Sequence, residues 1–572
     1  MKVSDFIADF LSKKGIKSVF ELSGGMITHI LDSLRQTTDI HIVTMHHEQA
    51  AAFAAEGFAR VKGIPGVALA TSGPGATNLL TGIGSCYFDS VPAIFITGQV
   101  NTHEQKADRP IRQLGFQETD IVSMAKPITK ATFLVNDASD IESVFENAFE
   151  IAMGGRPGPV LIDIPMNVQR EQIEITGNVE TIVENFNVDK EMILKLIQAI
   201  KNSKAPLILA GHGIRVSRSQ ELFDSFVEQV KIPVITSLLG LDTIPYDDPL
   251  RVGFIGSYGN RWANIAFGEC DLLIVLGARL DIRQTGADTK FIENRNIYHI
   301  DCESGEINNR VKGCHPIVCD LGLFFKSFAS FEHLQKFNLK EDWYRRIDSL
   351  KRQWPDTSEL SVKGINPNYF VHELSKSSKL AKVFLADVGS HQMWASQSLE
   401  LQRGQRFLTS GGMGAMGFAL PAAIGACLGL HNAPVVVMIG DGCMQINLQE
   451  LQTIIRNKLN IKIIVFNNQS LGMIRQFQDS YFESRYQSTY WGYSAPNFEK
   501  VAQAYDINSK TISSENEIFD ALNWLWSSEN EESPLLLQVM IEPHTNTYPK
   551  IAFGKPITEM EPFSKPIEME GT

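Results

Sequence analysis

Short apolar runs alternate with amphipathic stretches along most of the chain. Clear examples of such runs are 67–70, 93–96, 206–210 and 272–276. Each of these ends near a Gly- or Thr-containing turn, as the buried strands of a parallel sheet do. The stretches between them have helical periodicity. This alternation predicts an α/β protein built on parallel sheets.

Breaks in this pattern divide the chain into blocks. With 572 residues the chain exceeds what one hydrophobic core organises, so two to four domains are expected. We place three strand–helix domains at 1–170, 190–335 and 365–545. The tail, 546–572, is rich in Pro, Glu and Met and has little periodicity. It is expected either to be disordered or to form a lid over a site.

Composition and charge narrow the classes of function. Hydrophobic residues make up 44% of the chain and charged residues 20%, as in ordinary soluble proteins. The formal net charge of -13 argues against a nucleic-acid partner. No apolar run is long enough for a membrane span, and we expect the amphipathic N-terminal segment to be no signal peptide. The seven cysteines are scattered, which fits a reducing cytoplasm.

Two segments far apart in sequence carry the candidate chemistry. Glu48 lies in the first, His-Glu-Gln-Ala-Ala at 47–51. The second has a predicted strand, a Gly-Asp-Gly turn at 440–442, a helix, another strand and an Asn-Asn pair at 467–468. Carboxylate and amide oxygens are ligands for Mg²⁺, and glycines let backbone N–H groups approach phosphate oxygens. A lone Gly-Asp-Gly is usually only a turn, but these elements in this order predict a cation held on a diphosphate.

The second segment resembles the thiamine diphosphate (ThDP) motif, and Glu48 resembles the glutamate that activates this cofactor. The three-block plan resembles the acetolactate synthase (acetohydroxyacid synthase) large-subunit family over essentially the whole chain. That resemblance implies three doubly wound parallel-sheet domains, which bind the cofactor's pyrimidine, FAD and the diphosphate in that order. It also implies a homodimer or a dimer of dimers, with active sites at the dimer interface.

The resemblance assigns roles to single residues. Glu48 would share a proton with the aminopyrimidine, while Asp441, Asn468 and the backbone carbonyl of Ser470 would bind Mg²⁺. Gln117, with its neighbour Phe116, would act on the acceptor side. The other residues expected to contact ThDP are Ser72, Asn78, Gly389, Ser390, His391, Gly414, Met416, Gly440, Gly442 and Cys443. The residues expected to hold FAD, in a structural and not a redox role, are Gly211, Gly213, Arg279, Arg283, Asp301 and Asp320.

Departures from the family pattern gather where an acceptor would enter. The family's Gly-Tyr-Pro-Gly-Gly-Ala is replaced by Glu-Leu-Ser-Gly-Gly-Met at 21–26, and the segment between 99 and 116 is longer and more basic. The acceptor-site candidates are Gly25, Arg109, Arg112, Arg283, Arg475 and Phe477. Because Arg binds phosphate bidentately, these changes suit a larger acceptor that carries phosphates. The alternative is that the basic segment is an ordinary solvated loop.

The resulting hypothesis is a ThDP- and Mg²⁺-dependent carboligase. It would decarboxylate pyruvate and transfer the acetyl unit to a ketone acceptor. The departures resemble a flavin-containing, yersiniose-type subgroup of the family, so the predicted acceptor is a nucleotide-linked 4-keto deoxysugar. The alternative is an acetolactate synthase that condenses two pyruvates.

Other readings conflict with named features of the chain. A decarboxylase that forms no C–C bond would not need Arg283, the expected anchor of the acceptor carboxylate. A catalytically inactive scaffold subunit would not need an intact Glu48 and Asp441. An NAD-dependent dehydrogenase would need the G-x-G-x-x-G fingerprint, which the middle block lacks. Taken singly, Glu48 could be an ordinary helix-start carboxylate and Met416 a core residue.

Overall fold

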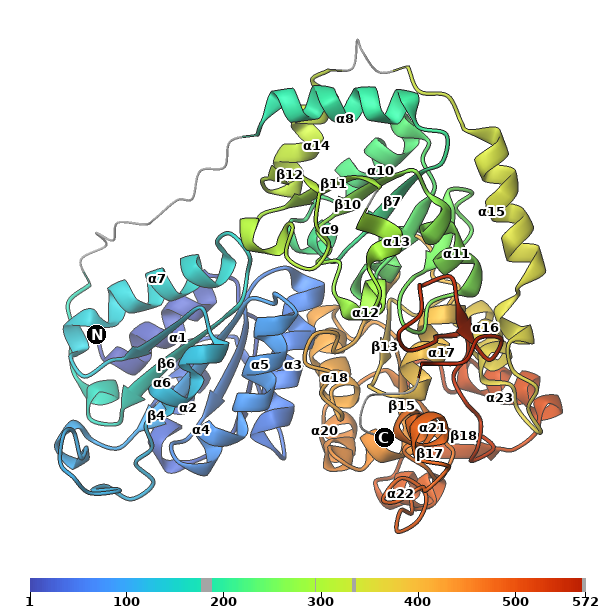
Figure 1. Cartoon of the computed structure of the whole chain (residues 1–572). Helices are drawn as coiled ribbons and strands as arrows, with labels where there is room; N and C mark the ends of the chain where they lie inside the picture. Colours follow the sequence, from blue (N-terminus) through green and yellow to red (C-terminus); the bar gives the residue numbers. More distant parts are fainter. Residues whose placement is uncertain (176–187, 294, 332–335, 568–572) are drawn as a thin grey trace.

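The computed structural model describes residues 1–175, 188–293, 295–331 and 336–567 (Figure 1). Three six-stranded sheets, each with all its strands parallel, are flanked by helices within these ranges. The predicted α/β class with three doubly wound domains is therefore confirmed. None of the helices in the described ranges is both long and apolar enough to cross a lipid bilayer.

The first domain has the strand order β2-β1-β3-β4-β6-β5. Its strands are β1 (Ser18–Leu22), β2 (His41–Thr44), β3 (Gly66–Ala70), β4 (Ala93–Gln99), β5 (Ala131–Leu134) and β6 (Pro159–Pro165). Its helices are α1 (Val3–Lys13), α2 (Thr28–Thr37), α3 (Glu48–Lys62), α4 (Pro74–Asn78), α5 (Leu80–Phe88), α6 (Ile121–Ala125) and α7 (Ile141–Met153). The two apolar runs that were predicted as strands here form β3 and β4.

The middle domain has the strand order β12-β11-β10-β7-β8-β9. Its strands are β7 (Pro206–Ala210), β8 (Val234–Thr236), β9 (Arg251–Phe254), β10 (Leu272–Leu276), β11 (Asn296–Asp301) and β12 (His315–Val318). Its helices are α8 (Lys190–Asn202), α9 (Gly213–Val216), α10 (Gln220–Val230), α11 (Arg261–Glu269), α12 (Ile282–Thr285), α13 (Lys290–Glu293) and α14 (Leu321–Ala329). A connecting helix, α15 (Glu341–Gln353), leads to the third domain.

The third domain has the strand order β14-β13-β15-β16-β18-β17. Its strands are β13 (Val383–Ala386), β14 (Arg406–Leu408), β15 (Val435–Gly440), β16 (Ile461–Asn467), β17 (Asn508–Ile512) and β18 (Leu535–Met540). Its helices are α16 (Pro367–Ser377), α17 (Ser390–Ser398), α18 (Ala419–Gly429), α19 (Asp441–Met444), α20 (Leu451–Arg456), α21 (Gly472–Tyr481), α22 (Phe498–Ala504) and α23 (Ile518–Leu525). Every residue of β15 and β16 is buried, as expected of central strands covered on both faces.

Helix α3 of the first domain packs along α18 of the third (Figure 1). Their backbones touch. A Cβ atom on Gly57 would lie 2.0 Å from the carbonyl oxygen of Ala422, and one on Gly425 would lie 1.8 Å from that of Ala54. Neither position therefore accepts a side chain. This close crossing fixes the start of α3, and Glu48 with it, relative to the third domain.

The described part of the tail is ordered. A short hairpin, β19 (Lys550–Ile551) with β20 (Met560–Glu561), packs its apolar side chains into the core of the middle domain. Arg261 of that domain donates to the carbonyl oxygens of Met560 and Glu561 at 3.3 and 2.9 Å. Ile551, Ile557 and Met560 thus cover an apolar surface of the middle domain, which favours the ordered alternative for the described residues of the tail. Residues 568–572 lie outside the described residues.

A largely buried polar network ties α16 to a residue that precedes it and to one that follows α17. His372 on α16 lies 3.0 Å from an oxygen of Asp356 and 2.8 Å from one of Glu400. Burial alone would lower the pKa of His372, but hydrogen bonds and charge from the two carboxylates outweigh burial and raise the pKa. The protonated form therefore stabilises the fold. That contribution is complete below the unfolded-state pKa of about 6.5 and is lost as the pH rises through the higher folded-state value.

We predict that His372→Gln lowers the free energy of unfolding by about 2 kcal/mol at pH 6 and by clearly less at pH 9. Urea unfolding at the two pH values measures this difference. The exposed His431→Gln is the matched control and should have no such pH-dependent effect. A loss of stability that is the same at both pH values would contradict the charged network.

Candidate active site

Three neighbouring strands of the third sheet end at the residues that the sequence predicts to bind a diphosphate and its Mg²⁺. Strands β13, β15 and β16 pair in parallel, so their carboxyl ends lie at one edge of the sheet. Ser390 and His391 begin the helix after β13, Asp441 begins the helix after β15, and Asn468 follows β16. These four residues thus meet at the edge of the sheet where open α/β sheets bind their ligands.

Several polar atoms at this edge are buried without a partner. Ser390 Oγ, His391 Nε2 and Asp441 Oδ2 make no hydrogen bond to the described residues. Burying such atoms costs about 1–3 kcal/mol each unless a ligand satisfies them. Glycines pack directly against two of these side chains: a Cβ on Gly440 would lie 2.7 Å from the His391 ring, and one on Gly472 would lie 3.0 Å from Ser390 Oγ. This edge is therefore built to receive a polar ligand.

The ligand set at the edge suits a hard cation with phosphate. Asp441 Oδ1 accepts from the N–H of Gly442 at 2.8 Å, which leaves Oδ2 for a cation. Burial raises the pKa of Asp441 to about 6. Asn468 Oδ1 accepts from the N–H of Ser470 at 3.2 Å, which places both residues in one tight turn. Carboxylate and amide oxygens of this kind fit Mg²⁺, and the N-terminus of α17 fits the anion.

The segment with Gly414 and Met416 reaches the same edge. Asp387, at the end of β13, accepts from the N–H groups of Gly417 and Ala419 at 3.0 and 2.7 Å. A Cβ on Gly442 would lie 3.4 Å from Met416 Cε, so this methionine covers the Gly-Asp-Gly turn. The structure therefore brings the predicted apolar wedge and the predicted metal ligands together.

Glu48 is the first residue of α3 and is buried. One of its oxygens accepts from Asn78 Nδ2 at 2.9 Å. The preceding turn is held from the third domain, because Glu450 Oε1 accepts from the N–H of His46 at 2.9 Å. Ser72 is buried on the same side of the first domain, and its Oγ makes no hydrogen bond to any described residue. The Glu48 carboxylate is thus held within the first domain, and the turn just before it is held by the third domain.

The acceptor-site candidates are scattered. Gly25, Arg109 and Arg112 are exposed in the first domain. The loop that carries both arginines is closed at its base, where the Glu118 carboxylate accepts from the N–H groups of Lys106 and Leu114. Exposed basic side chains on a closed loop fit either a contact with an anion or a solvated surface.

Phe116 and Gln117 follow that loop. Phe116 is 79% exposed, and Gln117 has a positive φ of 66°. Gln117 packs beside Gly73, whose added Cβ would lie 3.0 Å from the Gln117 Cβ. The glutamine is thereby placed next to the glycine-rich turn that begins α4, on the side of the domain that carries Glu48.

Arg475 and Phe477 lie on α21 but face different surroundings. Phe477 is 39% exposed and packs on Tyr481 with ring centroids 4.7 Å apart. Arg475 is only 1% exposed, and its guanidinium contacts Asp479 and Asn546. Sequence alone could not have shown that this arginine ties α21 to the tail, because its partner Asn546 is 71 residues away.

A cavity of about 540 Å³ lies where the middle domain meets the other two. Of the residues predicted to hold FAD, Gly213, Arg279, Arg283, Asp301 and Asp320 line it. Gly211 is not among its described lining residues and instead packs on the backbone of the middle domain, since an added Cβ would lie 2.1 Å from Gly277 O.

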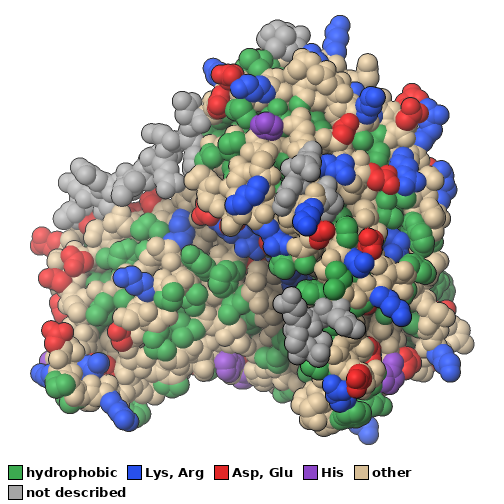
Figure 2. Space-filling view, viewed as in Figure 1, with side chains coloured by type: hydrophobic (Ala, Val, Ile, Leu, Met, Phe, Trp, Pro, Cys, Tyr) green, Lys and Arg blue, Asp and Glu red, His purple; other side chains and the backbone are tan. Residues whose placement is uncertain are grey.

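The wall of this cavity is rich in arginine. Arg156 and Arg218 line it together with the predicted Arg279 and Arg283, and basic side chains gather in this hollow (Figure 2). Burial raises the pKa of Asp301, on the same wall, to about 6. The described lining also includes Asp89, Asp281, Asp301 and Asp320, so it is the size of the cavity and its mixture of arginines and aspartates that fit a nucleotide-sized molecule. Arg156 and Arg218 were missed from sequence because neither lies at a strand end of the middle domain.

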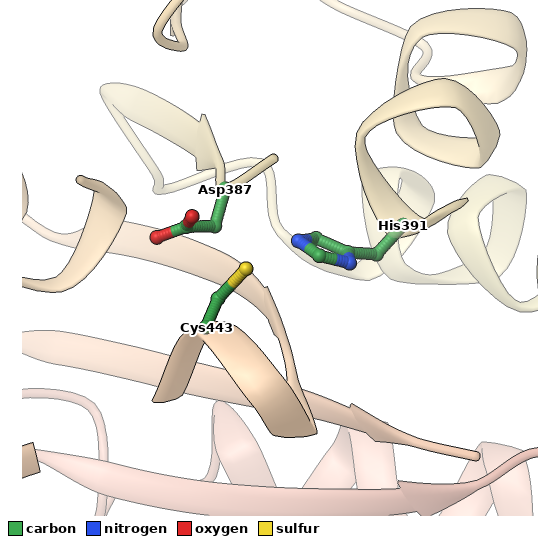
Figure 3. A group of neighbouring side chains, drawn as sticks. All are labelled: Asp387, His391 and Cys443. Carbon is green, nitrogen blue, oxygen red and sulfur yellow. The ribbon is translucent and has the colours of Figure 1, made fainter. Parts of the chain in front are cut away.

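Asp387, His391 and Cys443 form a compact group of potential metal ligands (Figure 3). The Asp387 carboxylate points away from the imidazole and is occupied by backbone N–H groups. The Cys443 thiol donates to the carbonyl oxygen of Val388, and burial raises its pKa far above the ordinary value. Burial also lowers the pKa of His391 to about 3. Since their donors and acceptors are largely paired, we assign no metal to this group.

Comparison with known proteins agrees with this geometry. Residues 1–124, 193–328 and 387–539 match the N-terminal TPP binding, central and C-terminal TPP binding domains of thiamine pyrophosphate enzymes. The acetolactate synthase large subunit of Cyanidium caldarium is 36% identical over 98% of this chain and 97% of its own length. The chain belongs to the acetolactate synthase large-subunit family.

Other members of this family give the same picture. The large subunit of Lactococcus lactis subsp. lactis is 35% identical over 97% of this chain and 95% of its own. A probable large subunit of Methanocaldococcus jannaschii is 37% identical over 100% and 96%. The chain is accordingly a ThDP-dependent, acetolactate synthase-like transferase that forms C–C bonds. Membership also argues against the NAD-dependent dehydrogenase reading.

We predict that Asp441→Asn and Asn468→Ala each raise the Mg²⁺ concentration needed for ThDP binding about tenfold or more, because each removes an oxygen ligand. Magnesium titrations followed by intrinsic fluorescence would measure this. Asp506→Asn, an exposed aspartate of the same domain, is the control. An unchanged Mg²⁺ requirement in both site variants would refute these ligands.

Proposed function

We propose that the protein is a ThDP- and Mg²⁺-dependent carboligase that decarboxylates pyruvate and transfers the two-carbon unit to a second pyruvate. The observation that carries the cofactor assignment is the set of buried, unpartnered atoms of Ser390, His391 and Asp441 at the edge of the third sheet. The choice of acceptor is supported by whole-length similarity to acetolactate synthases. The acceptor we expected from sequence, a nucleotide-linked sugar, has less support.

The roles of the residues follow from their places. When bound, ThDP supplies the ring that takes up the electrons left by the departing CO₂. Asp441, Asn468 and the Ser470 carbonyl would hold Mg²⁺, and Ser390 and His391 would bind the phosphates. Met416 would press the cofactor into its bent shape. The Glu48 carboxyl would give and take a proton at the pyrimidine ring.

We further propose a homodimer in which Glu48 of one copy serves the site of the other. Large apolar side chains are exposed in segments that adjoin the site residues, and a second copy of the chain would cover these side chains. These side chains are Phe116, Met413, Ile446, Ile474 and Phe477. We also place the protein in the cytoplasm, because all seven of its cysteines are free, as is usual in a reducing compartment.

The arginine-rich cavity is proposed to hold FAD in a structural role. We predict that the purified protein carries a yellow flavin chromophore, and that Arg279→Met weakens flavin retention about tenfold by removing one charge-assisted contact. Absorbance after gel filtration measures the bound fraction. Arg403→Met, an exposed arginine away from the cavity wall, should retain the flavin. A colourless wild-type protein that takes up no added FAD would contradict the assignment.

A second candidate acceptor is a nucleotide-linked 4-keto deoxysugar, favoured by the exposed Arg109 and Arg112 on the basic loop. Arg475 gives this candidate little support because its guanidinium is already engaged inside the chain.

Product analysis with pyruvate alone, and with such a sugar added, separates the two acceptors. We predict acetolactate as the main product in both reactions, with kinetics within about twofold of wild type for Arg109→Ala/Arg112→Ala, because solvated side chains contribute little. A two-carbon adduct on the sugar that forms faster than acetolactate, and that the double variant loses, would establish the sugar acceptor instead.

A further inference from the structure

A buried cluster of charges lies at the boundary between the first and third domains. Arg60 on α3 donates from Nη2 to Asp89 Oδ2 at 2.6 Å and to Glu56 Oε1 at 2.5 Å. All three side chains are at most 2% exposed. The cluster belongs wholly to the first domain in sequence, since Asp89 directly follows α5.

Its hydrogen bonds, however, reach into the third domain. Asp89 Oδ2 accepts from the N–H of Gly411 at 2.9 Å, and Asp89 Oδ1 accepts from that of Gly412 at 2.6 Å. Arg60 Nη1 donates to the carbonyl oxygen of Thr409 at 2.9 Å. The backbone of 409–412 is therefore held at three points by side chains of another domain.

The held segment lies between the two candidate cofactor sites. It follows β14 and leads directly to Gly414 and Met416, which adjoin the Gly-Asp-Gly turn. Gly411 and Gly412 also line the arginine-rich cavity, as does Asp89 itself. A shift of 409–412 would therefore move the groups expected to contact the bent cofactor.

A purely structural reading is that the cluster only joins the domains. Buried ion pairs contribute little net stability, because the loss of hydration offsets much of their attraction. Apolar packing between α3 and α18 already joins these domains closely. What apolar side chains cannot do is accept from two successive backbone N–H groups, and the two oxygens of Asp89 do this.

We propose that Asp89, with its charge balanced by Arg60, is a positioning residue for ThDP. It fixes 409–412 so that Gly414 and Met416 meet the pyrimidine end of the cofactor. The inference rests on the proposed function. It concerns only the pyrimidine end, since the diphosphate is assigned to Ser390, His391 and Asp441.

The test compares two ligands of the purified full-length protein in the presence of Mg²⁺, by isothermal titration: ThDP and inorganic pyrophosphate. Asp89→Asn replaces one acceptor oxygen with an N–H donor that faces a backbone N–H. We expect ThDP affinity to fall about tenfold, as for the loss of a charge-assisted hydrogen bond, with pyrophosphate affinity unchanged.

Asp242→Asn is a matched control. Asp242 is also a buried aspartate that pairs with arginines, Arg215 and Arg406, and accepts from a backbone N–H, that of Phe407 at 3.1 Å. It acts on the same stretch of chain but upstream of the held segment. This variant should lose thermal stability and keep the wild-type ratio of ThDP to pyrophosphate affinity.

Gly412→Ala perturbs the contact from the other side, because its Cβ would lie 3.0 Å from Asp89 Oδ1 and 2.8 Å from Phe88 Cβ. If Asp89→Asn does not fold, Gly412→Ala tests the positioning role in its place. We expect this variant to show the same selective loss of ThDP affinity. Equal losses for both ligands, or no loss, would overturn the positioning role. A wild-type protein that binds pyrophosphate but not ThDP would refute the proposed function itself, and this inference with it.

Discussion

The close crossing of α3 and α18 is the constraint on which the candidate site depends. Two glycines, Gly57 and Gly425, let the helix backbones touch, and a single methyl group at either position would collide with a carbonyl oxygen. The crossing fixes the position of Glu48, the first residue of α3, relative to the third domain of the same chain. It also brings Arg60 and Asp89 to the backbone of 409–412. The first and third domains of one chain are thus held in register by packing of small residues, which tolerates almost no change in volume.

The third sheet supplies the complementary half of the site. Its central strands are wholly buried, which makes them a rigid base, while their carboxyl ends present polar atoms without partners. Leaving Ser390, His391 and Asp441 unsatisfied costs stability in the absence of ligand. A bound Mg²⁺–diphosphate would satisfy these groups and so stabilise the folded state by linkage. The same atoms that weaken the empty protein are those expected to bind the cofactor.

Local patterns were sufficient for the parts of the fold that local physics determines. The apolar composition of the runs that form β3, β4, β7 and β10 was enough to predict them as strands. The spacing of the Gly-Asp-Gly and Asn-Asn motifs was enough to place Asp441 and Asn468 at neighbouring strand ends. Contacts between distant segments left no such signal. Arg475 was predicted as an acceptor ligand, but its guanidinium contacts the tail. The hairpin of the tail likewise depends on an apolar surface of the middle domain. The sequence did not indicate a role for Asp89, because the backbone N–H groups that donate to it lie more than 300 residues away.

An experimental structure of the protein with Mg²⁺ and ThDP would show whether the polar atoms at the edge of the third sheet bind the cofactor. We expect the diphosphate between Ser390, His391 and Asp441, with Mg²⁺ on Asp441 and Asn468. Met416 should lie between the cofactor's rings, and the pyrimidine should lie against Glu48 of a second copy. A cofactor bound elsewhere, with the atoms at the edge of the third sheet still unpartnered, would contradict this expectation.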